Sequence, residues 1–110
     1  MQSAPAIRHV ILDRDGVLNR EAPDYGWITR PEDWTWESGA LEALCLLKRA
    51  GLRISIASNQ SGVGRGVMTV EDLQRVTAKM LREAEAAGGR IDEVVYCPHA
   101  PDAGCECRKP

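Results

Sequence analysis

Three short apolar runs alternate with two amphipathic helical segments, and this alternation restricts the fold of the chain more than any other feature. The apolar runs lie at residues 7–12, 52–57 and 91–96. A helix is predicted over 39–50, and Thr69 opens a second one that ends before Gly88 and Gly89. Because parallel strands need long crossovers and helices supply them, this order predicts an α/β fold with a helix-covered parallel sheet.

The segments between the periodic runs add further expectations. Ser38 is expected to cap the first helix. Residues 16–37 show no sustained period and hold three tryptophans among charges and turn residues, which predicts a long loop or flap. Within this flap, Trp34 and Trp36 are expected to cover the edge of the core. His9 is expected to precede the first strand and to have a structural role.

Length and charge restrict the class of protein. The chain has 110 residues, enough for one small domain. Fourteen Lys and Arg residues against sixteen Asp and Glu residues leave a formal charge of −2 with neither sign gathered into a block, which argues against a nucleic-acid partner. The first six residues carry no signal-peptide pattern, and no stretch reaches the ~20 apolar residues of a membrane span. We therefore expect no membrane partner and a cytoplasmic location.

Polar side chains that could carry chemistry follow each predicted strand. Asp13 and Asp15 come after the first strand, Ser58 and Asn59 after the second, and Cys97 after the third. Ligands of such sheets bind beyond the carboxyl ends of the strands, so the three strand ends indicate one site. Taken alone, the acid pair fits an acidic turn with a local cap as well as it fits catalysis. The hydroxyl and amide that follow the second strand suit a phosphoryl group, although a polar glycine turn has the same composition.

A cluster of cysteine and histidine near the end of the sequence has the residue types of a metal site. Cys97, His99, Cys105 and Cys107 are ligands of the kinds that zinc takes in closed tetrahedral sites. Their one-residue gaps are shorter than those of common zinc fingers, so an incidental cysteine cluster stays open as an alternative. Four protein ligands leave no position for water, which predicts a structural metal. Cys45 stands apart and is expected to be a small core residue.

Three motifs together resemble those of the haloacid-dehalogenase-like phosphatases. This family has Asp-x-Asp-Gly after its first strand and Ser or Thr after its second, which residues 13–16 and Ser58 match. Residues 13–19, 58–66 and 97–110 are most similar to the branch that removes the C7 phosphate of D-glycero-D-manno-heptose 1,7-bisphosphate for lipopolysaccharide core synthesis. Histidinol-phosphate phosphatases of histidine biosynthesis are the alternative, since they share the acid pair, the zinc loop and Arg-Lys-Pro. The resemblance implies a three-layer, Rossmann-like parallel sheet.

The resemblance also implies a role for each residue of the site. Asp13 would be the nucleophile that forms an aspartyl-phosphate, and Asp15 the acid that protonates the leaving alkoxide and then activates water. Lys109 and Mg²⁺, the latter bound by Asp13 and the backbone carbonyl of Asp15, would cancel the repulsion between carboxylate and phosphate. The other residues would bind a small sugar bisphosphate or zinc: Ser58 and Asn59 at the phosphoryl oxygens, Arg65 and Arg108 at a second phosphate, and Cys97, His99, Cys105 and Cys107 around Zn²⁺.

The chain also departs from the family pattern, because the family continues beyond Arg-Lys-Pro with a Gly-Asp segment whose acids complete the magnesium site. We therefore expect residues 1–110 to be the amino-terminal part of a single phosphatase domain whose C-terminal part is missing, with a flap at 16–37 and a zinc loop at 97–107. The strand at 7–12 would then be a free edge of the sheet. Such a chain is expected to be weakly stable and inactive alone, and the full-length enzyme to be a monomer. A non-catalytic, zinc-clipped fragment that binds a phosphorylated ligand is the remaining alternative.

Overall fold

A parallel sheet of three strands forms the centre of the computed structural model, which describes residues 7–23, 26–100 and 102–109. The strands are β1 (His9–Leu12), β2 (Arg53–Asn59) and β3 (Glu93–Cys97), and they lie in that order. Leu12 pairs with Ile56, and Asn59 with Cys97. The predicted α/β fold with a parallel sheet is confirmed. Flap residues 24 and 25, and residues 101 and 110 of the third motif, lie outside the described residues.

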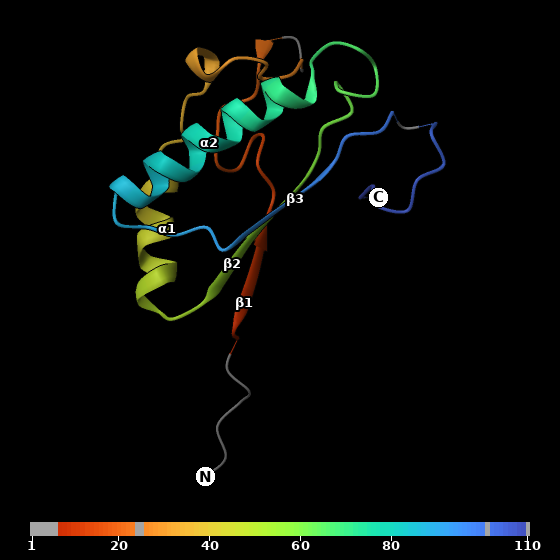
Figure 1. Cartoon of the computed structure of the whole chain (residues 1–110). Coiled ribbons are helices and arrows are strands. Elements are labelled where there is room, and N and C mark those ends of the chain that lie inside the picture. The colour runs from red at the N-terminus through yellow and green to blue at the C-terminus, as the bar shows by residue number, and fades with distance from the viewer. Residues whose placement is uncertain (1–6, 24–25, 101, 110) are drawn as a thin grey trace.

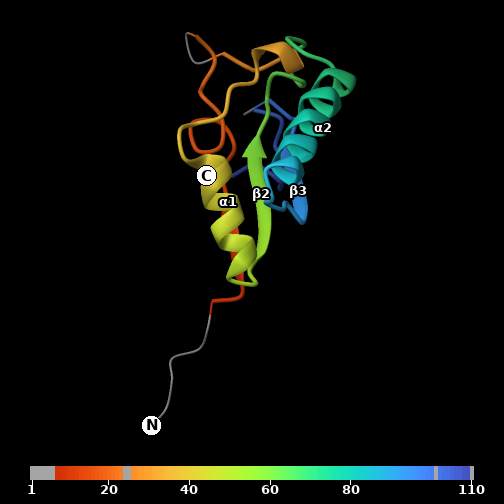
Figure 2. The ribbon, with the colours of Figure 1, turned by 90° about the vertical axis from the view of Figure 1, so that its left-hand side faces the viewer.

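Both long helices cover the same face of this sheet. Figure 1 shows α1 (Ala40–Arg49) and α2 (Val70–Ala86) on one side of the strands, and Figure 2, which looks onto that side, shows β2 between them. Each crossover joins two parallel strands, and both crossovers step in the same direction along the sheet. Because both have the same handedness, they place α1 and α2 on the same face of the sheet. The side chains buried between sheet and helices include Leu44, Ile54, Ile56, Val76 and Met80.

The predicted helix signals are confirmed for α2 and wrong in part for α1. Thr69 caps α2 through a capping box with Asp72, in which each side chain bonds to the backbone N–H of the other residue. Gly88 takes a φ of +90° after the last turn, as a helix-ending glycine does. At α1, however, the N-cap is Gly39 with a φ of +82° and no side-chain cap bond. Ser38 therefore stands one residue too early for its hydroxyl to cap the first turn.

The strand boundaries also differ from the sequence-based prediction. β1 begins at His9, so this residue lies in the strand, where its Nε2 is 2.7 Å from Oγ of Ser55. β2 and β3 begin and end later than the predicted 52–57 and 91–96, and they include Ser58, Asn59 and Cys97 as their last residues. These three side chains therefore stand on the rigid ends of paired strands rather than in the loops that follow.

The flap folds back onto the core instead of standing clear of it. Its ends are joined by backbone bonds from Arg20 N–H to Thr35 O at 2.8 Å and from Glu37 N–H to Leu18 O at 2.7 Å. A short 3₁₀ helix, η2 (Pro31–Asp33), precedes Trp34, which is buried in the core. The predicted cover of the core edge by Trp34 is thus confirmed, and Trp36 packs beside it with ring centroids 5.1 Å apart.

Both edges of the sheet, at β1 and at β3, and the face opposite the helices have no partner among the described residues. β1 pairs only with β2 there, as expected for the 7–12 segment, and Ile11 is 65% exposed on the face opposite the helices. In the described part of the chain, neither α1 nor α2 is long and apolar enough to cross a membrane.

Candidate active site

The carboxyl ends of the strands meet at a pocket of about 460 Å³. Its lining contains five of the side chains predicted for the site, together with Glu21 from the flap: Asp13, Asp15, Glu21, Ser58, Asn59 and Lys109. The parallel register brings these side chains together, because Asp13 follows β1 directly and Ser58 and Asn59 end β2. Glu21 was not singled out from the sequence, since nothing in the local pattern shows that the flap turns back over the acid pair.

Asp13 presents its carboxylate to this pocket from a tight turn. Oδ1 accepts a hydrogen bond of 2.7 Å from the backbone N–H of Arg14, and the ammonium of Lys109 lies 3.1 Å from the same oxygen. The side chain is 47% exposed. Gly16 reverses the chain with a φ of +82°, and a Cβ at that position would lie 3.1 Å from Oε1 of Glu21. The backbone angle favours glycine here, and the end of the Glu21 side chain lies close to it.

Asp15 is held by three side chains that donate to both of its oxygens. Arg14 bonds Oδ1 through Nε at 3.1 Å and Nη2 at 3.0 Å, and Asn19 bonds the same oxygen at 3.0 Å. Gln60 donates to Oδ2 at 2.7 Å. These donors fix the orientation of the carboxylate at the pocket wall. The sequence analysis missed all three, because their burial is visible only in the folded chain.

Arg14 is the least expected of these residues, since its side chain is completely buried. Its guanidinium lies 5.6 Å from the ring of Trp34 and 5.5 Å from the ring of Tyr96, and it donates to the Tyr96 hydroxyl at 3.2 Å. A buried cation is tolerated only where a counter-charge and hydrogen bonds replace water, and Asp15 supplies that charge. Arg14 therefore links the flap, β3 and the acid pair.

Ser58 and Asn59 lie side by side in the sequence but have different partners. The Ser58 hydroxyl is buried and accepts a hydrogen bond of 2.9 Å from Gln60, which leaves its own hydrogen to donate. The Asn59 amide instead bonds the backbone of Lys109, with Nδ2 3.2 Å from the Lys109 carbonyl oxygen and Oδ1 2.9 Å from its nitrogen. The Lys109 ammonium then donates to the carbonyl of Ala57 at 2.8 Å.

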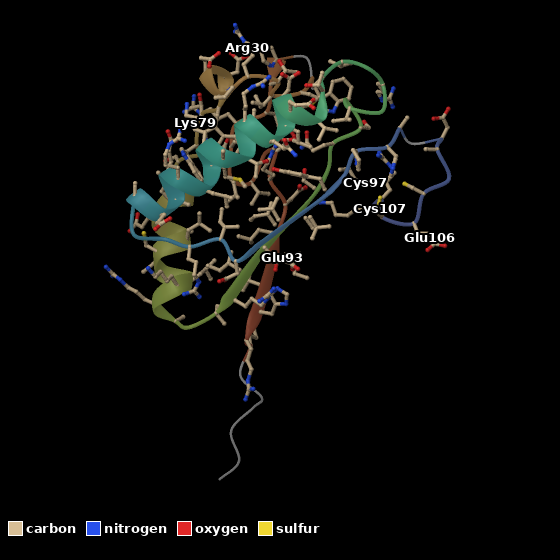
Figure 3. All side chains as sticks on the ribbon, viewed as in Figure 1. Arg30, Lys79, Glu93, Cys97, Glu106 and Cys107 are labelled. Carbon is tan, nitrogen blue, oxygen red and sulfur yellow. The ribbon has the colours of Figure 1, made fainter. Side chains whose placement is uncertain are left out.

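The four predicted metal ligands converge beside the site. Their ligand atoms lie within 4.8 Å of one another, with Cys97 and Cys105 sulfurs 3.4 Å apart and the Cys107 sulfur 3.3 Å from Nδ1 of His99. Ligands of a tetrahedral zinc with ~2.3 Å bonds lie ~3.7 Å from each other, so the cluster has the size of a metal site. Figure 3 shows Cys97 and Cys107 together in the loop, with Glu106 turned away.

The electrostatics of the cluster distinguish two of its thiols. A hydrogen bond from Cys107 lowers the pKa of Cys97, helped by the His99 backbone N–H, Cys105 and the charge of Arg108, although burial opposes it. The same hydrogen bond raises the pKa of Cys107, which donates it, to about 12. Zinc binds thiolates, so a metal ion held by these four ligands would replace the shared protons. Cys45 lies in α1, half-buried and away from the cluster.

The glycine-rich segment after β2 owes its composition to packing. A Cβ on Gly64 would lie 2.7 Å from the nitrogen of Ala100 and 2.9 Å from the carbonyl oxygen of Pro98. The Gly64 N–H donates to that oxygen at 2.7 Å, so the backbone of the glycine-rich loop contacts the backbone of the loop at residues 97–107, the metal loop below. Gly62 similarly faces the ring of Trp27, which a Cβ would approach to 2.9 Å. These glycines allow both loops to pack against the site.

The structure does not bring the two predicted arginines into the lining of this pocket. Arg65 is exposed, and its guanidinium lies 5.9 Å from the ring of Trp27. Trp27 lines a second pocket of about 550 Å³ formed by residues of the flap itself, and this pocket shares Glu21 with the first. Arg108 is partly buried, and its Nη1 has no hydrogen-bond partner among the described residues.

Comparison with known proteins gives a consistent family of relatives. A D-glycero-β-D-manno-heptose-1,7-bisphosphate 7-phosphatase of Pseudomonas putida is 41% identical over 101 residues, covering 92% of this chain and 57% of that protein. The crystal structure of a D,D-heptose 1,7-bisphosphate phosphatase from B. bronchiseptica with magnesium and phosphate matches with a TM-score of 0.88 and 38% identity, over 94% of this chain and 57% of that one.

A third match is informative for the fold alone. The crystal structure of a putative haloacid-dehalogenase-like phosphatase from Mesorhizobium loti has a TM-score of 0.79 at 24% identity, over 97% of this chain and 50% of that one. No family model matches the sequence. The chain spans little more than half the length of the relatives it matches. The haloacid-dehalogenase-like fold predicted from the three motifs is thereby confirmed.

Proposed function

We propose that this chain, a homologue of the D-glycero-β-D-manno-heptose-1,7-bisphosphate 7-phosphatases, carries the phosphoryl-transfer site of a magnesium-dependent phosphatase that acts on the C7 phosphate of that sugar. The observation that supports this most directly is the half-exposed carboxylate of Asp13, which opens into one pocket with Ser58 and Lys109. A nucleophile, a hydroxyl donor and a cation are the groups that phosphoryl transfer needs at one point.

The reaction would proceed in two steps. An oxygen of Asp13 attacks phosphorus, and the bond from phosphorus to the C7 oxygen breaks. For this step Asp15 would carry a proton on Oδ2, the oxygen that does not face Arg14, and would give it to the leaving oxygen. Asp15 then takes a proton from water, whose oxygen attacks the aspartyl-phosphate and releases inorganic phosphate, restoring Asp13. Two like unit charges 4 Å apart at an effective dielectric of 20 repel by about 4 kcal/mol, so the approach of phosphate requires cations. Lys109 supplies one of them at 3.1 Å from Asp13.

The pocket also fits a magnesium ion by its chemistry. Three carboxylates, those of Asp13, Asp15 and Glu21, face one ammonium group in the lining, and carboxylate oxygen is the ligand that Mg²⁺ prefers. Asp13 and the backbone carbonyl of Asp15 would hold the ion. When bound, the ion supplies positive charge against the phosphoryl oxygens.

In the same proposal, zinc occupies the Cys97, His99, Cys105 and Cys107 cluster as a structural ion. Four converging protein ligands within 4.8 Å leave no open position, which supports a closed site. Such an ion would hold the loop that leads from Cys107 to Arg108 and Lys109.

The remainder of the substrate would lie against the flap. Glu21 joins the two pockets, and Arg65 stacks over Trp27 beside the second one, where a cation could meet the other phosphate of a bisphosphate. Arg108, with an unpaired buried Nη1, is the second such cation. A small sugar phosphate as the partner, a cytoplasmic place of action and a role in lipopolysaccharide core synthesis complete this proposal.

The test is phosphate release by the protein expressed from its complete reading frame. With Mg²⁺, we expect turnover of D-glycero-β-D-manno-heptose 1,7-bisphosphate and little of histidinol phosphate. Asp13→Asn is expected to abolish turnover, whereas Asp102→Asn, an exposed position outside the pocket, is expected to retain it. Full activity of Asp13→Asn, or a preference for histidinol phosphate, would refute the assignment.

A further inference from the structure

We propose that Asn59 is a positioning residue that places the ammonium of Lys109 against Asp13, and is not a ligand of the phosphoryl group. The inference rests on the proposed function, and it gives Asn59 a role different from the one that the sequence implied. It starts from the pairing of the Asn59 side-chain amide with both backbone groups of Lys109, fifty residues further along the chain.

The hydrogen bonds of Asn59 occupy Oδ1 and one of the two Nδ2 hydrogens, which fixes the orientation of the amide and leaves at most one donor for an anion. Oδ1 is an acceptor and faces the Lys109 N–H at 2.9 Å, while Nδ2 donates to the Lys109 carbonyl oxygen at 3.2 Å. Phosphate needs donors, and Ser58 next to it has a hydroxyl hydrogen left for that purpose. Turning the Asn59 amide toward phosphate would strand both backbone groups of Lys109.

Lys109 needs such an anchor because the segment that carries it has no regular structure. Residues 102–109 form no helix or strand, and Lys109 follows the last metal ligand, Cys107, by two positions. A free lysine side chain loses rotamer entropy when it is held in one place. The two hydrogen bonds from the Asn59 side chain, here called the clasp, fix the backbone of Lys109. With the backbone fixed, Nζ of Lys109 reaches both the carbonyl of Ala57 at 2.8 Å and Oδ1 of Asp13 at 3.1 Å.

Asn59 is well placed to act as the fixed partner. It ends β2, where it pairs with Cys97, the first metal ligand, and β2 is the central strand of the sheet. The segment from Cys97 to Lys109 is therefore attached through the strand pair, the backbone bond from Gly64 to Pro98, the Cys/His cluster and the Asn59 clasp, and the clasp is the attachment nearest to Lys109. Removal of the clasp frees the end of the loop without touching Asp13, Ser58 or the ligands.

The experiment is a double-mutant cycle of Asn59→Ala and Lys109→Met in the protein from the complete reading frame, with metal content checked for each variant. Misplacement of a catalytic group by about 1 Å can cost ~100-fold, so we expect Asn59→Ala to lower kcat by about 10- to 100-fold. Inhibition by inorganic phosphate should stay nearly unchanged. In the Lys109→Met background, Asn59→Ala should cost nothing further, because it acts through Lys109.

Ser55→Ala is the matched control, since it also removes side-chain hydrogen bonds from β2 but lies outside the pocket. This variant should keep the kcat of the wild type. Losses that add in the double variant, or weaker phosphate inhibition with an unchanged kcat, would overturn the proposal in favour of a structural or substrate-binding role.

A second readout does not depend on turnover. The Lys109 amide hydrogen is bonded to Asn59, so its exchange with solvent, followed by NMR, should speed up by about tenfold or more in Asn59→Ala and not in Ser55→Ala. An unchanged exchange rate would overturn the clasp. If the wild type releases no phosphate while the exchange result holds, the proposed function fails and the clasp stands.

Discussion

The ammonium nitrogen of Lys109 lies 3.1 Å from Oδ1 of Asp13, although the two residues stand near opposite ends of the chain. Their meeting requires the sheet to pair β1 with β2 and the metal loop to return across the end of β2. The charge balance at the Asp13 carboxylate therefore depends on the tertiary structure around it.

Removal of the Lys109 charge should impair chemistry more than substrate binding. Loss of one preorganised group that stabilises developing charge costs ~10²–10³ in kcat, and we expect Lys109→Met to fall in that range. Steady-state kinetics on the sugar bisphosphate measure the effect. Lys48→Met, which removes a lysine charge on α1 away from the pocket, should behave as the wild type. Equal losses in both variants would show a general charge effect instead.

The Cys/His cluster should bind one metal ion per chain. Native mass spectrometry is expected to show one zinc in the wild type and none in Cys107→Ser, because a thiolate ligand is lost. Cys45→Ser should keep its zinc, since Cys45 lies outside the cluster. Chelation of the metal should lower the melting temperature of the wild type. A zinc-free wild type with an unchanged melting temperature after metal addition would contradict a structural ion.

Gly64→Ala should destabilise the contact between the glycine-rich loop and the metal loop. Its Cβ would lie 2.7 Å from the nitrogen of Ala100, and relief of such overpacking typically costs about 1–3 kcal/mol. Urea unfolding measures the loss, and a weaker affinity for zinc should accompany it. In Gly26→Ala the new Cβ meets only Pro23 O at 3.4 Å, an ordinary contact, so this control should lose less. Equal stability of the two variants would show that the loops separate easily.

Arg14→Met should lower the free energy of unfolding by about 2–4 kcal/mol, since it removes one partner of a buried ion pair and leaves the Tyr96 hydroxyl without that donor. Asp15 keeps its bonds to Asn19 and Gln60, which limits the loss. Chemical denaturation gives the value, with Arg82→Met on the exposed side of α2 as the control. If Arg14→Met is as stable as the control, then the methionine side chain packs between the rings of Trp34 and Tyr96 as favourably as the guanidinium does.

Stability should fall in acid, partly through Asp92. The backbone N–H of Ile54 donates to this carboxylate at 2.8 Å and, with Arg90 and Arg53, lowers the pKa of Asp92. A group whose folded pKa is depressed stabilises the fold above its unfolded pKa, near 4, and loses that contribution as pH falls through the folded value. Asp92→Asn should therefore be less stable than the wild type at pH 7, with a difference that shrinks below about pH 4.

Urea unfolding over a pH series checks this effect, and Asp102→Asn, an exposed control, should follow the wild type at every pH. A difference between wild type and Asp92→Asn that is independent of pH would exclude the charge of Asp92 as the cause.

Much of the fold and of the site could be predicted because the relevant signals are local. Apolar alternation indicates the strands, the Thr69 and Asp72 pair marks the start of α2, and parallel pairing brings Asp13 and Ser58 to one edge of the sheet. The spacing of the four metal ligands is likewise contained in one short segment. Ser38 failed as a cap because the turn at Gly39 shifts the helix start by one residue.

What the sequence alone determined was the order of elements and the kinds of groups that stand at the strand ends, since periodicity and chain direction set both. The tertiary structure alone decided which partners those groups have. Arg14 is buried against Asp15, Glu21 reaches the pocket, and Asn59 holds Lys109. The contact of Asn59 with Lys109 joins positions fifty residues apart, and Arg14 is buried only because Trp34 and Tyr96 close over it. Hydrogen bonds of this kind form only after packing has excluded water and fixed the distances.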